Sequence, residues 1–175
     1  MREPWGAGHE TKPSLSQTVS SARFLFRVGS WAKLQGVLAA QQFECNSDVL
    51  GLFVGLAWKA GKAQSIMTGD FGPEQSTSLF KCSSAAGLNA LEPSPKAPIK
   101  TVLYRGGTMD PTLSYGMAWT EKKDVAAFFA TRMNENVPVV LSTRTADNQV
   151  LARFKHESEV VLPYEPSRPF EIEFL

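Results

Sequence analysis

Hydrophobic positions in the first half of the chain follow the spacing of α-helices. Across residues 18–43 apolar side chains recur every three or four residues, and two glycines interrupt the pattern, so we expect one bent helix or two short ones. Residues 46–48 (Asn-Ser-Asp) offer N-cap candidates for a second helix, which we expect over residues 49–63. A short third helix is expected over residues 76–88.

The second half shows short apolar runs instead, which are typical of β-strands. It follows a proline-rich connector, LEPSPKAPIK, at residues 91–100. The pattern predicts strands over residues 101–104, 137–143, 150–154, 157–162 and 170–174. One amphipathic helix is expected at residues 121–133, with a buried stripe made of Val125, Phe128, Phe129 and Met133. The predicted class is therefore α+β, with an N-terminal helical region packed on a compact core built around a mixed β-sheet.

These patterns divide the chain into three parts. Residues 1–17 are polar, contain glycine and proline, and are expected to be disordered or loosely ordered. Residues 18–97 form the helical region, and residues 98–175 form the β-rich core. The longest apolar run has ten residues, whereas a membrane-spanning helix needs about 20, and the N-terminus lacks the apolar segment of a secretory signal. We therefore expect a soluble protein without a membrane partner, located in the cytoplasm of its own cell or of a target cell.

Composition excludes several functional classes. The chain has 175 residues, a net charge of +1, two cysteines and two histidines. Two cysteines cannot form a disulfide framework or a cysteine-rich zinc site, and no metal site is expected with so few histidines. Cys45 and Cys82 are expected to be small buried fillers. The near-neutral charge excludes a broad nucleic-acid-binding surface, although not a local one.

Two glutamates close to the last apolar runs pose a physical problem. Successive side chains of a strand point to opposite faces, so Glu157 and Glu159 would share a face next to the apolar residues 160–162. Like charges at that distance disfavour each other, and burial increases the cost. His156 would lie on the opposite face, as a bystander. Such a pair is explained if it meets positive charge during a reaction.

Two further features precede these glutamates. Arg105 ends the first predicted strand and is followed by Gly106 and Gly107. An arginine fork suits a phosphate or ribose oxygen, and the glycines would let a ligand approach the backbone. Trp119 and Thr120 lead into the predicted helix, where Thr120 is a good N-cap and Glu121 suits the first turn.

In this order the three features resemble the mono-ADP-ribosyltransferases of the arginine–serine–glutamate class. These are the cholera-toxin-like and clostridial-toxin-like enzymes and their small bacterial and phage relatives, and the resemblance covers about residues 101–175. It implies that Glu159 is the catalytic glutamate, that Glu157 accompanies modification of arginine, and that Arg105 holds NAD. Gly106, Trp119 and Thr120 would also contact NAD, which is a substrate here, and no metal is implied.

The chain departs from the family pattern at Ala118-Trp119-Thr120, which falls where the family has Ser-Thr-Ser. Ala118 lacks the leading hydroxyl, and the spacing from Arg105 to Thr120 is that of compact relatives. The implied acceptor is a protein arginine. The alternatives are an NAD glycohydrolase, a transferase that acts on a nucleic acid or small molecule, and a catalytically inactive binding module of the same fold. Taken singly, each residue also has an ordinary structural explanation: surface glutamates, a turn arginine and a core tryptophan.

Overall fold

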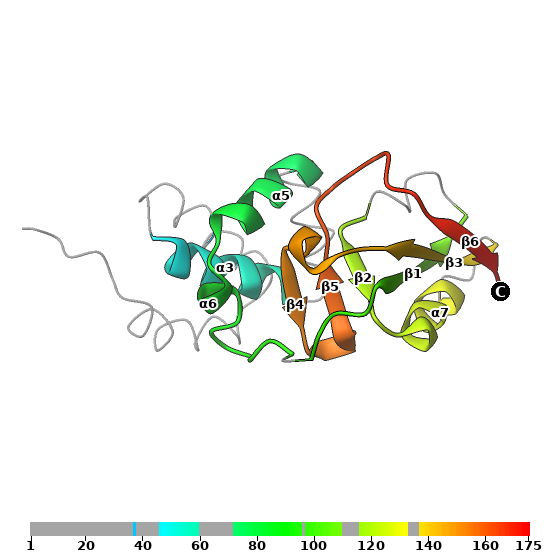
Figure 1. The fold of residues 1–175 in the computed structure, drawn as a ribbon, viewed down its shortest axis with the longest axis horizontal. Coiled ribbons are helices and arrows are strands. Elements are labelled where there is room, and N and C mark those ends of the chain that lie inside the picture. The colour runs from blue at the N-terminus through cyan, green and yellow to red at the C-terminus, as the bar shows by residue number, and fades with distance from the viewer. Residues whose placement is uncertain (1–36, 38–45, 60–71, 96, 110–115, 133–136) are drawn as a thin grey trace, which may run out of the picture.

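The structure is a computed structural model that describes residue 37 and residues 46–59, 72–95, 97–109, 116–132 and 137–175 (Figure 1). Within these residues the protein is α+β, with four α-helices and a six-stranded antiparallel sheet. The expected helices over residues 18–43 lie outside the described residues apart from Val37, which is buried. The predictions for residues 1–17 and for Cys45 also lie outside them.

Three helices form the described part of the helical region: α3 (Ser47–Lys59), α5 (Gly72–Cys82) and α6 (Ala85–Leu88). Asn46 caps α3, because its Oδ1 accepts a hydrogen bond from the backbone N–H of Val49 at 3.0 Å. The single helix expected over residues 76–88 is two helices, because Ser84 has an extended backbone and its Oγ caps α6 by accepting from the N–H of Gly87 at 2.9 Å. Among the described residues, no helix is long and apolar enough to cross a membrane.

The expectation that Cys82 is a buried filler was wrong. Cys82 is the last residue of α5 and is exposed. The buried face of this helix consists of Ser76, Thr77, Leu79 and Phe80, and does not include Cys82. Because Cys82 lies outside that buried face, its side chain does not pack in the core.

The described strands form one sheet in the order β4-β5-β2-β1-β3-β6. Their bounds are β1 (Val102–Thr108), β2 (Ala118–Thr120), β3 (Pro138–Arg144), β4 (Ala152–Phe154), β5 (Glu159–Val161) and β6 (Glu171–Phe174). All five pairings are antiparallel, so the expected mixed sheet was wrong. The reason is that β2 and β3, which run in the same direction, are separated by β1, so no parallel neighbours arise.

Each of the five predicted strands is present, with three differences. The Arg-Gly-Gly segment continues β1 instead of ending it, since β1 runs to Thr108. The short strand β2 was not predicted, because its three residues fall below the length at which alternation can be detected. The strand expected to begin at Glu157 begins at Glu159.

Helix α7 (Lys123–Arg132) packs on β1 through small residues. Its buried positions are Ala126 and Ala130, whereas Phe128 is 60% exposed. The approach is close: a β-carbon at Gly106 would come within 1.7 Å of the carbonyl oxygen of Ala126. The predicted buried stripe was therefore wrong: Phe128 is exposed and Val125 and Phe129 are only half-buried, because a helix this close to the strand leaves room only for alanine at the contact. Met133 of that stripe lies outside the described residues.

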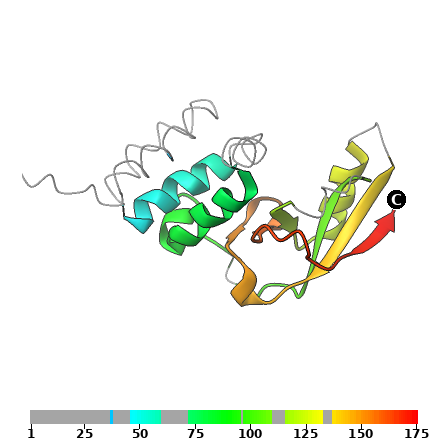
Figure 2. The same cartoon turned by 90° about the horizontal axis from the view of Figure 1, so that it is seen from above.

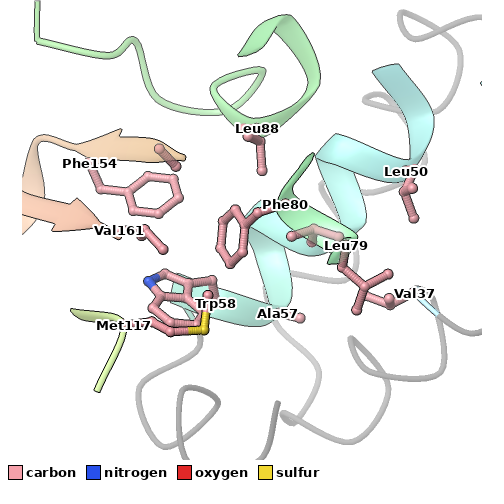
Figure 3. Close-up of a cluster of buried hydrophobic side chains, with 12 residues drawn as sticks. Val37, Leu50, Ala57, Trp58, Leu79, Phe80, Leu88, Met117, Phe154 and Val161 are labelled. Carbon is pink, nitrogen blue, oxygen red and sulfur yellow. The ribbon is translucent and has the colours of Figure 1, made fainter. Parts of the chain in front are cut away.

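A hydrophobic cluster joins the helical region to one end of the sheet. The helices α3, α5 and α6 lie beside β4 and β5, while α7 lies at the other end of the sheet (Figure 2). Figure 3 shows side chains from both parts in contact around Trp58. The cluster contains Val37, Leu50, Val54, Ala57, Trp58, Leu79, Phe80, Leu88, Met117, Ala152, Phe154 and Val161. The two parts thus share a core, and the division of the chain near Pro98 stays a prediction.

Candidate functional site

Three neighbouring strands carry the residues that the sequence singled out. Arg105 lies in β1, Thr120 ends β2 and Glu159 begins β5, and the sheet order places β2 between β1 and β5. Thr120 is directly opposite Glu159 on one side and Tyr104 on the other. Side chains of directly opposed residues are close neighbours on one face. The fold therefore brings together Thr120 and Glu159, which are far apart in the sequence, with Arg105 on the next strand, β1.

Arg105 lies where β1 and β2 separate. In the described residues these strands are paired only at Tyr104 and Thr120. Nη1 of Arg105 donates a hydrogen bond to the carbonyl oxygen of Ala118 at 2.5 Å. The guanidinium group also covers Gly116, where a β-carbon would lie 2.1 Å from Cζ. A glycine is needed at position 116 for Arg105 to bridge the two strands in this way.

Arg105 supplies positive charge to the site. Burial lowers the pKa of Arg105 to about 10, and the negative charge of Glu159 acts in the opposite direction. The guanidinium group is still a cation at neutral pH. The two residues are thus close enough for each to influence the ionisation of the other, so a cation and a carboxyl group share one region. Among the described residues, no group of three or more His, Cys, Asp or Glu side chains could hold a metal ion.

Glu159 is half-buried, and its ionisation is set by opposing influences. Burial raises the pKa of Glu159 to about 7, and the charge of Glu157 adds to the rise. A hydrogen bond from Trp58 and the charges of Arg105 and Lys59 lower it. That hydrogen bond runs from Nε1–H of Trp58 to Oε1 of Glu159 at 3.1 Å. Because loss of hydration outweighs the favourable contacts, this carboxyl group changes its charge close to neutral pH.

The structure corrects the predicted placement of Glu157. Glu157 lies in the 3-10 turn η3 (His156–Ser158), before β5 begins. It has φ of 58° and Ser158 has φ of 50°, so two successive residues adopt the left-handed conformation that non-glycine residues rarely adopt. The backbone rotation breaks the strand alternation, so Glu157 and Glu159 do not share a strand face. His156, expected on the opposite face, instead lies against Glu157, with Nε2 and Oε1 3.4 Å apart.

Thr120 and its neighbour hold this turn in place. Oγ1 of Thr120 donates a hydrogen bond to the carbonyl oxygen of Glu157 at 2.7 Å, and it accepts one from the N–H of Lys122 at 3.1 Å. The N–H of Glu121 donates to the carbonyl oxygen of Ser158 at 3.1 Å. Thr120 therefore stabilises the turn that precedes Glu159. Helix α7 begins only at Lys123, so Glu121 is not in its first turn and instead pairs with Arg153 at 3.0 Å.

Two of the residues expected to contact NAD, Trp119 and Gly106, pack against other parts of the protein. Trp119 is 2% exposed and packs in the core with Leu103 and Val160, while its Nε1–H donates to the carbonyl oxygen of Gly116 at 2.9 Å. Its ring is packed in this cluster, and the expected nicotinamide contact stays a prediction. The side of Gly106 that lacks a side chain is filled by α7, and whether its backbone meets NAD stays untested.

Sequence reasoning missed two residues that act on Glu159. Trp58 and Lys59 end α3, and the apolar run that contains Trp58 indicated only a buried helix. Nζ of Lys59 pairs with Glu92 at 3.0 Å and lies 4.7 Å from the centroid of the Phe154 ring. No local pattern could have revealed these roles, because Trp58 and Glu159 are 101 positions apart.

We found no match to this chain among protein-family models, curated proteins or solved structures.

Proposed function

We propose that the protein is a mono-ADP-ribosyltransferase with an ADP-ribosyltransferase-like sheet as its core. NAD would be the substrate, and an arginine side chain of a protein would accept the ADP-ribose. One observation carries the proposal: Arg105, Thr120 and Glu159 belong to three motifs that resemble this class, and they lie on the neighbouring strands β1, β2 and β5. Nothing in their separate sequence positions requires that arrangement.

The reaction begins with loss of nicotinamide from the ribose. The bond between C1′ and the nicotinamide nitrogen breaks, its electron pair stays with the nitrogen, and the ribose acquires oxocarbenium character. Because the leaving pyridinium departs as a neutral molecule, no general acid is needed. The ionised carboxylate of Glu159 would stabilise the positive ribose and accept a hydrogen bond from a ribose hydroxyl. A half-buried position makes that charge interaction stronger than it would be in water.

Arg105 would bind and orient the substrate. A guanidinium group pairs well with phosphate and ribose oxygens, and NAD carries two phosphates. The contacts of Arg105 with Ala118 and Gly116 hold it between β1 and β2, beside the carboxyl group of Glu159. A cation fixed at that position would place the bond to be broken close to the catalytic carboxylate.

Glu157 would serve the acceptor. Its side chain is 41% exposed, and its charge is felt at Glu159, so it lies beside the site and is open to solvent. A carboxylate there can orient the guanidinium group of an incoming arginine and take its proton as the new bond forms to C1′. The products are nicotinamide, ADP-ribosylated arginine and one proton.

The first test is release of nicotinamide from NAD by purified protein, with and without cell lysate. We expect wild-type protein to release it, Glu159→Gln to lose the activity, and lysate to increase it by supplying acceptors. Gln keeps the size of the side chain and an oxygen for the Trp58 hydrogen bond, so only the charge is lost. His156→Ala is the matched control, since His156 is 82% exposed and next to the same turn. No release under any condition would overturn the proposal and favour a binding module.

Product analysis separates the alternatives. With NAD labelled in the adenylate part, the proposal predicts label on protein that is removed by reagents specific for ADP-ribosylarginine. Free ADP-ribose without labelled protein would indicate an NAD glycohydrolase. Label on RNA or DNA would indicate a nucleic-acid acceptor.

A further inference from the structure

Trp58 is the residue of the described helical region whose side chain bonds to the catalytic carboxyl group. It lies in the last turn of α3 and is 2% exposed. Its Nε1–H donates to Oε1 of Glu159 at 3.1 Å. An indole N–H can donate and cannot accept, whereas an ionised carboxylate can accept and cannot donate. A neutral carboxyl group can also accept this bond through its carbonyl oxygen, but the bond stabilises the carboxylate more, so it favours the charged form of Glu159.

The direction of this N–H is fixed by packing. The rings of Trp58 and Phe80 meet edge to face, with centroids 5.0 Å apart and planes at 85°. Met117 and Val161 belong to the same buried cluster, and Figure 3 shows them around the indole together with Phe80. A side chain enclosed by α5, by the segment before β2 and by β5 cannot rotate without disturbing the core. The donor is thus held in place before any substrate arrives.

In the neighbouring strand β2, neither Thr120 nor Ala118 supplies a hydroxyl donor comparable to the N–H of Trp58. Thr120 lies directly opposite Glu159, but its single hydroxyl proton goes to the carbonyl oxygen of Glu157. Ala118, two residues earlier on β2, has no hydroxyl. Trp58, in α3, supplies a side-chain donor that these two residues of β2 do not supply.

Resting on the transferase function proposed above, we propose that Trp58 is a positioning residue: its indole N–H holds the Glu159 carboxylate in the orientation and charge state that NAD cleavage uses. The helical region would then contribute a residue to the catalytic site in addition to covering one end of the sheet. Lys59 adds to the effect from the same turn of α3, as does Arg105 from β1, whereas Glu157 in η3 opposes it.

The test removes the N–H and keeps the ring. Trp58→Phe is the simpler variant. Replacement of Trp58 by benzothienylalanine keeps the bicyclic shape, with sulfur in place of N–H, and serves if Trp58→Phe fails to fold. Leu50→Ala is the control, since Leu50 belongs to the same cluster but lies more than two turns before Trp58 on α3, away from the hydrogen bond. Each protein is assayed for nicotinamide release as a function of pH. The carboxyl pKa of Glu159 is followed separately by carbon NMR of labelled glutamate, assigned with Glu159→Gln.

We expect kcat to fall tenfold or more on loss of the N–H, since hydrogen bonds to charged groups are worth roughly one to two powers of ten in an equilibrium constant, while KM for NAD stays close to wild type. The pKa of Glu159 should rise in the NMR titration, and the acid limb of the pH–rate profile should move upward with it. Leu50→Ala should lower the Tm and leave that limb in place. If Trp58 had only a structural role, the N–H-deleted variant and the control would lose the same fraction of kcat.

The two proposals fail in different ways. An unchanged Glu159 pKa in both N–H-deleted proteins overturns the positioning role, whether or not the protein cleaves NAD. A raised pKa in a protein whose wild type releases no nicotinamide overturns the transferase function and leaves the hydrogen bond established as a determinant of Glu159 ionisation only.

Discussion

At the scale of single residues, the site depends on the charge of Glu159. Burial, the largest influence, favours the neutral carboxyl, whereas Trp58, Arg105 and Lys59 favour the carboxylate. The balance leaves its pKa at about 7. A small change in any of these groups would therefore change the fraction of Glu159 that is ionised at neutral pH.

The first prediction concerns the pH dependence of nicotinamide release. If the ionised carboxylate is the active form, kcat/KM should rise with pH and level off above a midpoint near the pKa of about 7. Bound NAD brings a positive nicotinamide to Glu159, so the midpoint for kcat should be lower. Assays from acid to weakly alkaline pH measure both. A kcat/KM that does not change between pH 6 and 8 would contradict the assignment.

The second prediction concerns stability. The carboxyl group of Glu159 has an ordinary pKa of 4.5 and one of about 7 in the folded protein, so between these values the folded chain binds more protons. Its stabilising effect is complete below pH 4.5 and is lost as pH rises through 7. Glu159→Gln should therefore raise the free energy of unfolding by roughly 1–3 kcal/mol at pH 8 and change it little at pH 4.

The measurement is urea unfolding of the wild-type protein and of Glu159→Gln, each at pH 4 and at pH 8. An inactive variant that is more stable than wild type at pH 8, and not at pH 4, would show that the site holds an unfavourable charge for its chemistry. Equal stability at pH 8 would contradict the raised pKa.

The third prediction separates the two glutamates. Glu157→Gln should keep hydrolysis of NAD and reduce transfer to protein roughly 100-fold or more, because only the acceptor loses its base. Glu159→Ala should lose both activities. Nicotinamide release and protein labelling are measured side by side. Equal losses of both activities in Glu157→Gln would argue against separate roles.

At the scale of elements, the sequence predicted most strands but not the details that shape the site. Alternation identified β3, β4 and β6 to within two residues. It failed at Glu157 and Ser158, because the left-handed turn there contains no glycine or asparagine to signal it. It also assigned large side chains to the buried face of α7, since periodicity cannot sense how closely a helix approaches Gly106.

The fourth prediction tests that close approach. Gly106→Ala places a β-carbon against the backbone of α7, within 1.7 Å of the carbonyl oxygen of Ala126, so the helix must move. We expect a loss of roughly 2–4 kcal/mol in the free energy of unfolding, measured by urea titration. Thr131→Ala, on the exposed side of α7, is the control and should cost far less. Comparable losses in both would show that the contact is not tight.

At the scale of the whole molecule, two regions that differ in sequence pattern depend on one another. The shared cluster draws Trp58 and Phe80 from the helices and Phe154 and Val161 from the strands. The sequence indicated a helical cover on a β-rich core and assigned Arg105 and Glu159 to one candidate site, which stays a prediction. It could not show that a helix reaches the carboxyl group of Glu159, because that contact is fixed by tertiary packing alone.

The fifth prediction follows from this dependence. A fragment of residues 98–175 lacks the helical side of the cluster and would expose Met117, Phe154 and Val161 to water. We expect it to lose cooperative unfolding and NAD cleavage. Thermal unfolding followed by circular dichroism is the measurement. A fragment that unfolds in one sharp transition and cleaves NAD as the full chain does would show that the core is independent.

The contact between Trp58 and Glu159 also gives the protein an internal optical reporter. Indole emission responds to charge near its N–H, and the carboxyl group that changes charge near neutral pH lies against that N–H. Of the two tryptophans in the described residues, Trp119 is buried in a separate cluster, so titration of Glu159 should act mainly on the light emitted by Trp58. Occupation of the site can then be followed in unlabelled protein, without any chemical turnover.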